Sequence, residues 1–252
     1  MTSGWDALDA ELELWAAQGL TLPLWWRDDD AIAPTEALTQ LEALAQQLGL
    51  PVHLAVIPKQ ATTELADHLK QSKSLIPVVH GWAHENHAPA DKKTCEFGST
   101  RVVDAALDEA EAGLTRLKQL FGAQLQPMFV PPWNRISPAL VPWLAGLDYT
   151  ALSAFGPRKK PNAAPGLLQV NTHIDPIDWK GSRSLLDEEQ ILATLLARLT
   201  ARRLGTEDRA EPLGYLTHHL VHDAAIWAFS ERLLSRLLAG PAKPWRYSER
   251  TS

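Results

Sequence analysis

Short apolar segments with the composition of β-strands alternate with helical patterns along the whole chain, and this alternation is the strongest constraint on the fold. There are seven such segments: TLPLWW (21–26), VHLAVI (52–57), SLIPVV (74–79), PMFV (127–130), DYTALS (148–153), LLQV (167–170) and LGYLT (213–217). Strands that alternate with helices form parallel sheets, because a parallel pair needs a crossover connection. We therefore predict an α/β fold, either an open doubly wound sheet or an irregular (β/α) barrel with about seven strands.

The chain is predicted to form a single domain. It has 252 residues, of which 45% are apolar, and this is sufficient for one large domain with a sizeable core. It contains no internal repeat and no linker long enough to divide it. We expect one domain over residues 1–252, with its core between residues 20 and 240.

Composition argues against several classes of partner. The formal net charge is −6 and the basic residues are scattered, so we expect no nucleic-acid partner. No run of eighteen apolar residues occurs, so we expect no membrane span. The first twenty residues contain four carboxylates and neither Lys nor Arg, unlike a secretory signal, and a single Cys95 forms no internal disulfide. These features favour a cytoplasmic location, and the sequence makes no prediction of oligomeric state.

Polar residues cluster directly behind the predicted strands. In parallel α/β folds the chemistry lies beyond the C-terminal ends of the strands, so these segments are candidate site loops. They are RDDD (27–30), HGWAHENH (80–87), PPWN (131–134), HIDPIDW (173–179) and THHLVHD (217–223).

The HGWAH segment favours a metal site. His80 and His84 converge on one ion if the intervening residues make a helical turn, which Gly81 eases. With a carboxylate from RDDD, they would form a set of two histidines and one aspartate with open coordination positions. Alone, each segment has a simpler interpretation, since histidine pairs of this spacing arise by chance and aspartates often cap helices. Successive side chains of a strand point to opposite faces, so Asp28 and Asp29 are expected to have different roles.

Five motifs in this order, RDDD, HGWAH, VPPWN, DPIDW and LTHH, resemble those of the polysaccharide deacetylase family, the carbohydrate esterase family 4 or NodB-homology group. The resemblance extends from Trp26 to about Asp223. It implies a distorted (β/α) barrel of seven strands, a divalent metal and hydrolytic deacetylation. The metal expected is zinc, with cobalt, manganese or nickel as alternatives.

The resemblance also implies roles for the residues that match the family's motifs. Asp28 corresponds to the general base, and Asp29 corresponds to the metal ligand that joins His80 and His84. Asp30 stands where the family has glycine, and we predict no role for it.

The fourth and fifth motifs imply the general acid and its supporting carboxylate. His218 follows its strand immediately and is the expected acid, with His222 as the alternative. Asp178 is the expected support, with Asp175 in reserve. A carboxylate beside an imidazole raises its pKa and keeps it protonated, as proton donation to a leaving amine requires.

One departure from the family pattern concerns the base. Val130 stands where the third motif normally has the arginine that pairs with the base, so Arg27 or Arg135 is expected to replace it. Four residues are expected to contact the substrate, namely Trp82, Trp133, Asn134 and Trp179. In the loop after the second motif, His87, Lys93 and Glu96 either line the site or belong to a solvated loop.

The function predicted is metal-dependent removal of an acetyl group from a sugar or oligosaccharide, from nitrogen rather than oxygen. In this reaction a metal-activated water attacks the acetyl carbonyl, with an Asp as base and a His as acid. Two alternatives stay open. The same site could hydrolyse another small amide, or the barrel could be an inactive, metal-containing carbohydrate-binding protein.

Overall fold

The structure is a computed structural model that describes residues 3–247, and in this part of the chain it contains one nine-stranded sheet. The strand order is β6-β7-β5-β4-β3-β2-β1-β8, and β9 also pairs with β1. All pairs are parallel except β6 with β7. The strands are β1 (Leu22–Ala31), β2 (Val52–Val56), β3 (Leu75–His80), β4 (Met128–Val130), β5 (Ala151–Leu152), β6 (Asn162–Ala164), β7 (Leu167–Gln169), β8 (Leu213–Thr217) and β9 (Ala242–Pro244).

The predicted α/β fold is confirmed, because each of the seven predicted segments overlaps one strand of this sheet, namely β1 to β5, β7 and β8. The sequence did not predict β6 and β9, which have three residues each. The path of strands ends at β6 and at β8, but the segment after β7 pairs in parallel with β8 at a bridge between Ile174 and Tyr215. The barrel is therefore distorted at this place, where a bridge replaces a regular strand pair.

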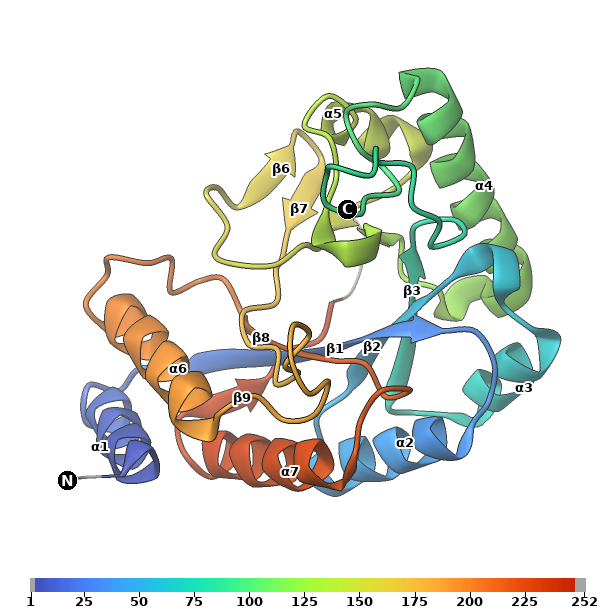
Figure 1. Ribbon diagram of the computed structural model, residues 1–252. Helices are drawn as coiled ribbons and strands as arrows, with labels where there is room; N and C mark the ends of the chain where they lie inside the picture. The colour runs from blue at the N-terminus through green and yellow to red at the C-terminus, as the bar shows by residue number, and fades with distance from the viewer. Residues whose placement is uncertain (1–2, 248–252) are drawn as a thin grey trace.

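Helices cover the outside of the sheet. Figure 1 shows α7 and α2 below it, α3 and α4 at the right, and α1 and α6 at the left. The α-helices are α1 (Gly4–Ala17), α2 (Glu36–Leu48), α3 (Thr63–Gln71), α4 (Val103–Phe121), α5 (Val141–Leu144), α6 (Glu188–Arg203) and α7 (Ala224–Ala239). Short 3-10 helices are η1 (Pro58–Gln60), η2 (Gly122–Gln124), η3 (Pro132–Asn134) and η4 (Ala145–Leu147). Among the residues that the structure describes, no helix has both the length and the apolar character to cross a membrane.

Local sequence signals explain where the helices begin and end, as α2 illustrates. The hydroxyl of Thr35 accepts a hydrogen bond from the N–H of Leu38 at 3.0 Å and satisfies one of the free donors at the helix start. The helix ends at Gly49, whose φ of 61° is the left-handed conformation that terminates many helices.

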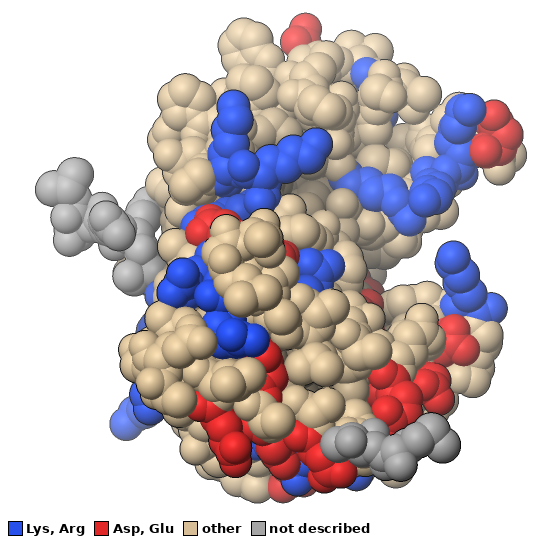
Figure 2. Space-filling model, turned by 90° about the vertical axis from the view of Figure 1, so that its left-hand side faces the viewer, with Lys and Arg blue, Asp and Glu red and all other residues tan. Residues whose placement is uncertain are grey.

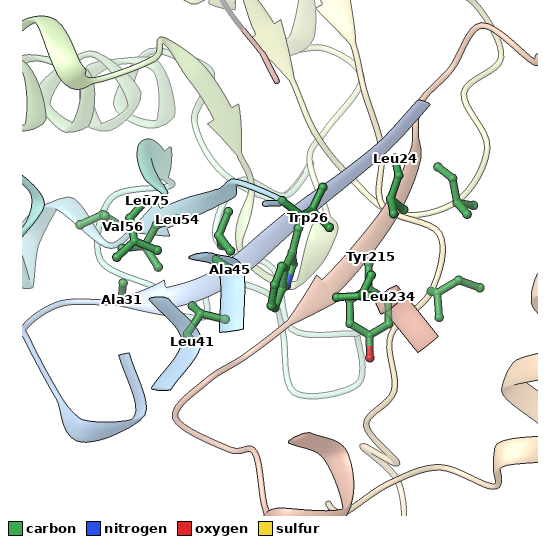
Figure 3. Packing of buried hydrophobic residues seen from close by; sticks show 14 of the residues in the cluster. Leu24, Trp26, Ala31, Leu41, Ala45, Leu54, Val56, Leu75, Tyr215 and Leu234 are labelled. Atoms are coloured by element: carbon green, nitrogen blue, oxygen red, sulfur yellow. The ribbon is translucent and has the colours of Figure 1, made fainter. Parts of the chain in front are cut away.

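The core beneath the candidate site is built from β1, β8 and the helices below them. Trp26 and Tyr215 are buried with ring centroids 6.4 Å apart, and Figure 3 shows both among side chains that include Leu41 and Leu234. Full burial of a large apolar side chain stabilises a fold by about 1.5–3 kcal/mol. The indole N–H of Trp26 also donates to the hydroxyl of Thr217 at 2.8 Å, which fixes the ends of β1 and β8 beside each other.

Candidate active site

The ends of β1, β3 and β8 and the loops after β4, β5 and β7 surround one pocket with a volume of about 730 Å³. Its lining includes six side chains capable of metal binding or proton transfer. These are Asp29, Asp30, His80, His84, Asp175 and His218. The segments selected from the sequence therefore meet at one place.

A cluster of one aspartate and two histidines fits a divalent metal. Asp30, His80 and His84 each offer one ligand atom, and these atoms lie within 4.8 Å of one another. The Oδ1 atom of Asp30 is 3.0 Å from Nε2 of His80 and 3.3 Å from Nε2 of His84. Carboxylate oxygen and imidazole nitrogen are the donors that zinc and related ions take in hydrolytic sites. Three such donors leave coordination positions for water and substrate.

The environment of His80 suits a metal ligand. Its Nδ1 lies 3.0 Å from the carbonyl oxygen of Val130, and a proton donated there leaves the lone pair on Nε2, which faces Asp30. Burial lowers the pKa of His80, but the carboxylates of Asp29 and Asp30 outweigh it, and the pKa lies above its ordinary value. The same negative charge attracts a cation, which competes with the proton for Nε2.

The turn that carries the two histidines is built around the buried carboxylate of Glu96. This side chain accepts hydrogen bonds from the backbone N–H groups of Ala83, at 2.7 Å, and Trp82, at 3.3 Å. Gly81 has a φ of 55°, and a Cβ atom there would lie 2.3 Å from the Glu96 carboxylate. Glu96 is therefore neither a pocket residue nor part of a solvated loop. It holds the turn in place.

The carboxylate in the cluster is Asp30, which corrects the expectation that Asp29 would join the two histidines. Asp29 is instead paired with Arg27, whose Nε and Nη2 atoms donate to its two oxygens at 2.8 and 2.9 Å. Arg27 also donates to the hydroxyl of Ser153 at 2.7 Å and to Oδ1 of Asn134 at 2.6 Å. These hydrogen bonds of Arg27 fix the carboxylate of Asp29 at the edge of the pocket. Arg27 was one of the two candidates for the arginine that the third motif lacks.

A β-bulge in β1 explains why Asp30, and not Asp29, joins the two histidines. Asp28 pairs with Leu54, and the next pair is Ala31 with Val56, so β1 has one residue more than β2 in this interval. Asp30 lies in the bulge with a φ of 74°, a left-handed conformation that aspartate tolerates better than most residues. The bulge re-aims this side chain towards the histidines, and simple alternation along the strand no longer applies.

Asp28, which the resemblance assigned as the base, is completely buried and does not line the pocket. Its Oδ2 accepts hydrogen bonds from the Thr217 hydroxyl at 2.6 Å and the His219 N–H at 3.0 Å, and its Oδ1 lies 2.5 Å from Nδ1 of His219. Burial raises the pKa of Asp28, but the His219 imidazole outweighs it, and the net shift is downward. Asp28 therefore ties the loop after β8 to β1. No sequence signal singled out His219.

His218 lines the pocket, with its Nε2 atom 4.0 Å from Oδ2 of Asp29. The ring of Trp179 contacts it edge-on, with ring centroids 4.7 Å apart. The indole N–H of Trp179 donates to Asp175 at 2.8 Å. Burial raises the pKa of Asp175, and the positive charge of His218 opposes this shift. The carboxylate beside His218 is thus Asp175, the reserve candidate.

Asp178, the first candidate for this support, lies outside the pocket. Its carboxylate accepts hydrogen bonds from the backbone N–H groups of residues 180–182 and thereby closes a local turn. His222, the alternative acid, also lies outside the pocket lining. Its ring centroid is 4.5 Å from that of Trp227, and burial lowers its pKa to about 4, so it is neutral at pH 7.

The remaining predicted residues also fall into two groups, those that line the pocket and those that do not. Trp133, Asn134, Trp179 and Arg135 line the pocket, whereas Trp82 packs against the core and His87 is exposed outside the pocket lining. The sequence did not single out four other lining residues, Thr94, Phe155, Arg183 and Val221. They lie on irregular loops, for which no periodic pattern exists.

Backbone strain is concentrated at this pocket. Six residues other than glycine among residues 3–247 have a positive φ, and five of them line the pocket: Asp30, His84, Trp133, Asn134 and Arg183. The sixth is Asp148. Such conformations cost about 1–3 kcal/mol each, and they persist where the surrounding structure requires them, most often at functional sites.

Solved deacetylase structures share this fold. A family 4 carbohydrate esterase from Streptomyces lividans, in complex with acetate, has a TM-score of 0.54 at 16% identity over 91% of this chain and 95% of its own. The peptidoglycan deacetylase PdaC from Bacillus subtilis has a TM-score of 0.55 at 12% identity, over 89% and 87%. The chitin deacetylase from the fungal pathogen Colletotrichum lindemuthianum has 0.52 at 12%, over 89% and 88%. The resemblance predicted from the five motifs is thereby confirmed for the fold.

Comparison at the level of sequence identifies no relative. No protein-family model matches the chain, and no curated protein matches it.

Proposed function

We propose that the protein is a metal-dependent hydrolase that removes the acetyl group from an N-acetylated sugar. One observation carries the proposal. A single pocket holds the Asp30, His80 and His84 cluster, a carboxylate fixed by an arginine at Asp29, and the imidazole of His218, which lies 4.0 Å from that carboxylate. The fold shared with proteins described as deacetylases supports the same reading.

Asp30, His80 and His84 would hold the divalent metal, for which we propose zinc. When bound, such an ion acts as a Lewis acid and lowers the pKa of water towards neutrality. The remaining steps of catalysis are assigned to side chains of this chain.

Asp29 is the general base in this proposal. Its two oxygens each accept one hydrogen bond from Arg27, and each retains lone pairs that are able to accept the proton of an attacking water. Arg27 is itself held by Ser153 and Asn134, so the carboxylate is oriented before substrate binds. A positioned base of this kind typically accelerates a reaction by about 10²- to 10⁴-fold.

His218 is the general acid. Water oxygen bonds to the acetyl carbon, the carbon–nitrogen bond breaks, and the leaving nitrogen takes a proton from Nε2 of His218, so that acetate and an amine are released. The carboxylate of Asp175 lines the same pocket and interacts electrostatically with His218. Trp179 contacts both residues and restricts the ring of the acid.

The acid favours an amide substrate over an ester. An amine is a poor leaving group and requires protonation, whereas an alcohol requires it less. Trp133, Phe155 and Trp179 provide apolar faces in the pocket, on which a sugar ring is able to stack. The cytoplasmic location expected from the composition stays a prediction.

The test is an acetate-release assay with N-acetyl sugars, O-acetyl sugars and simple acetamides, on protein supplied with zinc, cobalt or manganese and on protein treated with a chelator. We expect acetate from an N-acetyl sugar only when metal is present. Release of amine from simple acetamides alone would favour a different amide hydrolase. Stoichiometric metal binding without turnover of any substrate would favour the binding protein.

A further inference from the structure

Two arginines line the pocket without a charged partner. Arg135 follows η3, and Arg183 lies in the loop between β7 and α6. Within residues 3–247, neither guanidinium forms an ion pair with a carboxylate, whereas the third arginine of the region, Arg27, is paired with Asp29. The pocket therefore presents two uncompensated positive charges.

Arg135 is held in position by neutral oxygens. Its Nη1 donates to the carbonyl oxygen of Thr94 at 2.7 Å and to the hydroxyl of Thr94 at 3.1 Å. These contacts orient the guanidinium but leave its charge unbalanced. Of its five N–H donors, those on Nε and Nη2 stay available to a ligand. Arg135 directly follows Asn134 and Trp133, and the ring of Trp133 lies 4.2 Å from that of His84, so Arg135 belongs to the metal side.

Arg183 lies near His218, with Trp179 between them. Its guanidinium lies over the ring of Trp179 at 5.3 Å, and Trp179 contacts His218. Stacking on an aromatic face orients a guanidinium without neutralising it. Arg183 has a φ of 58°, a conformation unusual for a side chain of this size, and it is one of the strained residues around the pocket. The loop thus holds the exposed side chain of Arg183 at the pocket although its backbone conformation is unfavourable.

The positive charge of these two arginines contrasts with the charge of the chain as a whole. The chain as a whole has a formal net charge of −6, so an average surface is acidic. Figure 2 shows Lys and Arg side chains gathered on both sides of a hollow between the upper and lower halves of the molecule. Of the three aspartates that line the pocket, Asp29 is balanced by Arg27, Asp30 belongs to the cluster with His80 and His84, and Asp175 accepts the indole N–H of Trp179. A neutral sugar would leave both rim arginines unused.

We propose that the substrate is an acidic sugar, in which a carboxylate or phosphate group on the acetylated sugar binds Arg183 and Arg135. Guanidinium groups bind these anions through paired, charge-assisted hydrogen bonds, and such bonds are about twice as strong as neutral ones. The acetyl part of this inference rests on the proposed function, but the anion site is independent of turnover. Binding and hydrolysis therefore test the two separately.

The experiment measures dissociation constants by calorimetry on the whole 252-residue chain, supplied with metal. The probes are N-acetylglucosamine, its 6-phosphate, and N-acetylmuramic acid, which carries a carboxylate. We expect each acidic sugar to bind at least about tenfold more tightly than the neutral one, with the difference shrinking as salt is added. Arg183→Gln and Arg135→Gln should each remove about fivefold or more of this preference, so that affinity for the acidic sugars falls more than affinity for N-acetylglucosamine.

Arg209→Gln is the matched control, because Arg209 is an exposed arginine between α6 and β8 that does not line the pocket. Equal affinity of the wild-type protein for neutral and acidic sugars would overturn the proposal, and so would an equal loss in the control. If acidic sugars bind through Arg183 but no acetate is released, the anion site stands and the proposed function fails. If acetate is released from neutral and acidic sugars with equal kcat/KM, and both bind with equal affinity, the proposed function stands and the anion site is wrong.

Discussion

The guanidinium of Arg27 donates two parallel hydrogen bonds to the carboxylate of Asp29, at 2.8 and 2.9 Å, and both residues lie on β1. Residues two apart on a strand point to the same face, so the pair forms within one strand. It places a buried, oriented carboxylate beside the metal cluster although Val130 occupies the position where the family pattern has arginine. In the proposed mechanism, the partner of the base therefore belongs to the first motif and not to the third.

Replacing Arg27 by lysine tests the importance of this pair. We expect kcat to fall by about 100-fold with little change in KM, because lysine keeps the charge but lacks the fork that orients both oxygens of Asp29. Steady-state kinetics of acetate release measures the effect. Arg101→Lys is the control, since Arg101 makes a similar two-bond pair with Glu109 outside the pocket lining. A kcat equal to that of the wild type would show that Asp29 needs no such support.

Two neighbouring aspartates should respond differently to the same substitution. Asp29→Asn should retain stoichiometric metal and lose about 10²- to 10⁴-fold in kcat, because it removes only the base. Asp30→Asn should lose the metal, because Asp30 is the anionic member of the cluster. Elemental analysis after dialysis, together with kinetics, separates the two. Equal metal loss in both variants would contradict the assignment of Asp29.

The bulge in β1 was not predicted from the sequence, and it determines which of the three aspartates joins the histidines. The strand itself, the metal pair His80 and His84 and their joining carboxylate from RDDD were all anticipated. The choice among three consecutive aspartates depends on which one leaves the regular pairing, and this is decided by the register against β2. No role was predicted for Asp30, which stands at a glycine position of the family pattern, and the structure gives it the left-handed conformation that glycine adopts readily.

Loop geometry accounts for the other differences. The strand segments are nearly continuous apolar runs, because both faces of a parallel sheet are covered, so the α/β fold was predictable from the alternation of these runs with helical patterns. Trp82 and Trp179 are equally close to a motif in sequence, yet Trp82 packs against the core and Trp179 lines the pocket. Arg183 is four residues beyond Trp179 and reaches the pocket only because the intervening turn closes on Asp178. Such turns have no periodicity from which to predict them.

His218 and His222 are both candidates by sequence and are separable by substitution. His218→Ala should lower kcat for an N-acetyl sugar by about 10²- to 10⁴-fold, because the leaving nitrogen loses its proton donor. Hydrolysis of 4-nitrophenyl acetate, whose leaving group needs no proton, should fall much less. His222→Ala should keep both activities within a few fold, since His222 lies against Trp227 outside the pocket. The opposite pattern would move the acid to His222.

Asp28→Asn should act on stability rather than on metal binding. The Asp28 carboxylate is buried and accepts hydrogen bonds from Thr217 and His219, so replacing it leaves a buried imidazole without its anion. Loss of one partner from a buried pair costs about 3–5 kcal/mol in the free energy of unfolding. Urea unfolding measures this, with the exposed Asp67→Asn as control. Loss of metal at unchanged stability would instead place Asp28 in the metal site.

The acid sensitivity of the fold should depend on His53, a buried residue of β2. Its Nδ1 lies 3.2 Å from the carbonyl oxygen of Trp26, and its Nε2 accepts the N–H of Tyr247 at 3.0 Å. Both contacts are made by a neutral ring with its proton on Nδ1. Burial lowers the pKa of His53 from 6.5 to about 4. Between these two values the unfolded chain binds a proton that the folded chain does not.

The free energy of unfolding is therefore expected to be largest above pH 6.5 and to fall as the pH decreases towards 4. One such group contributes a slope of up to about 1.4 kcal/mol per pH unit. His53→Asn should be less stable at pH 7, because asparagine is able to donate to Trp26 but not to accept from Tyr247 in the same way. Its slope between pH 6 and pH 4.5 should nevertheless be smaller by about 1 kcal/mol per pH unit, as measured by urea unfolding at several pH values. His87→Asn, which changes an exposed histidine, should keep the wild-type slope, and an unchanged slope in His53→Asn would show that His53 is protonated in the folded protein.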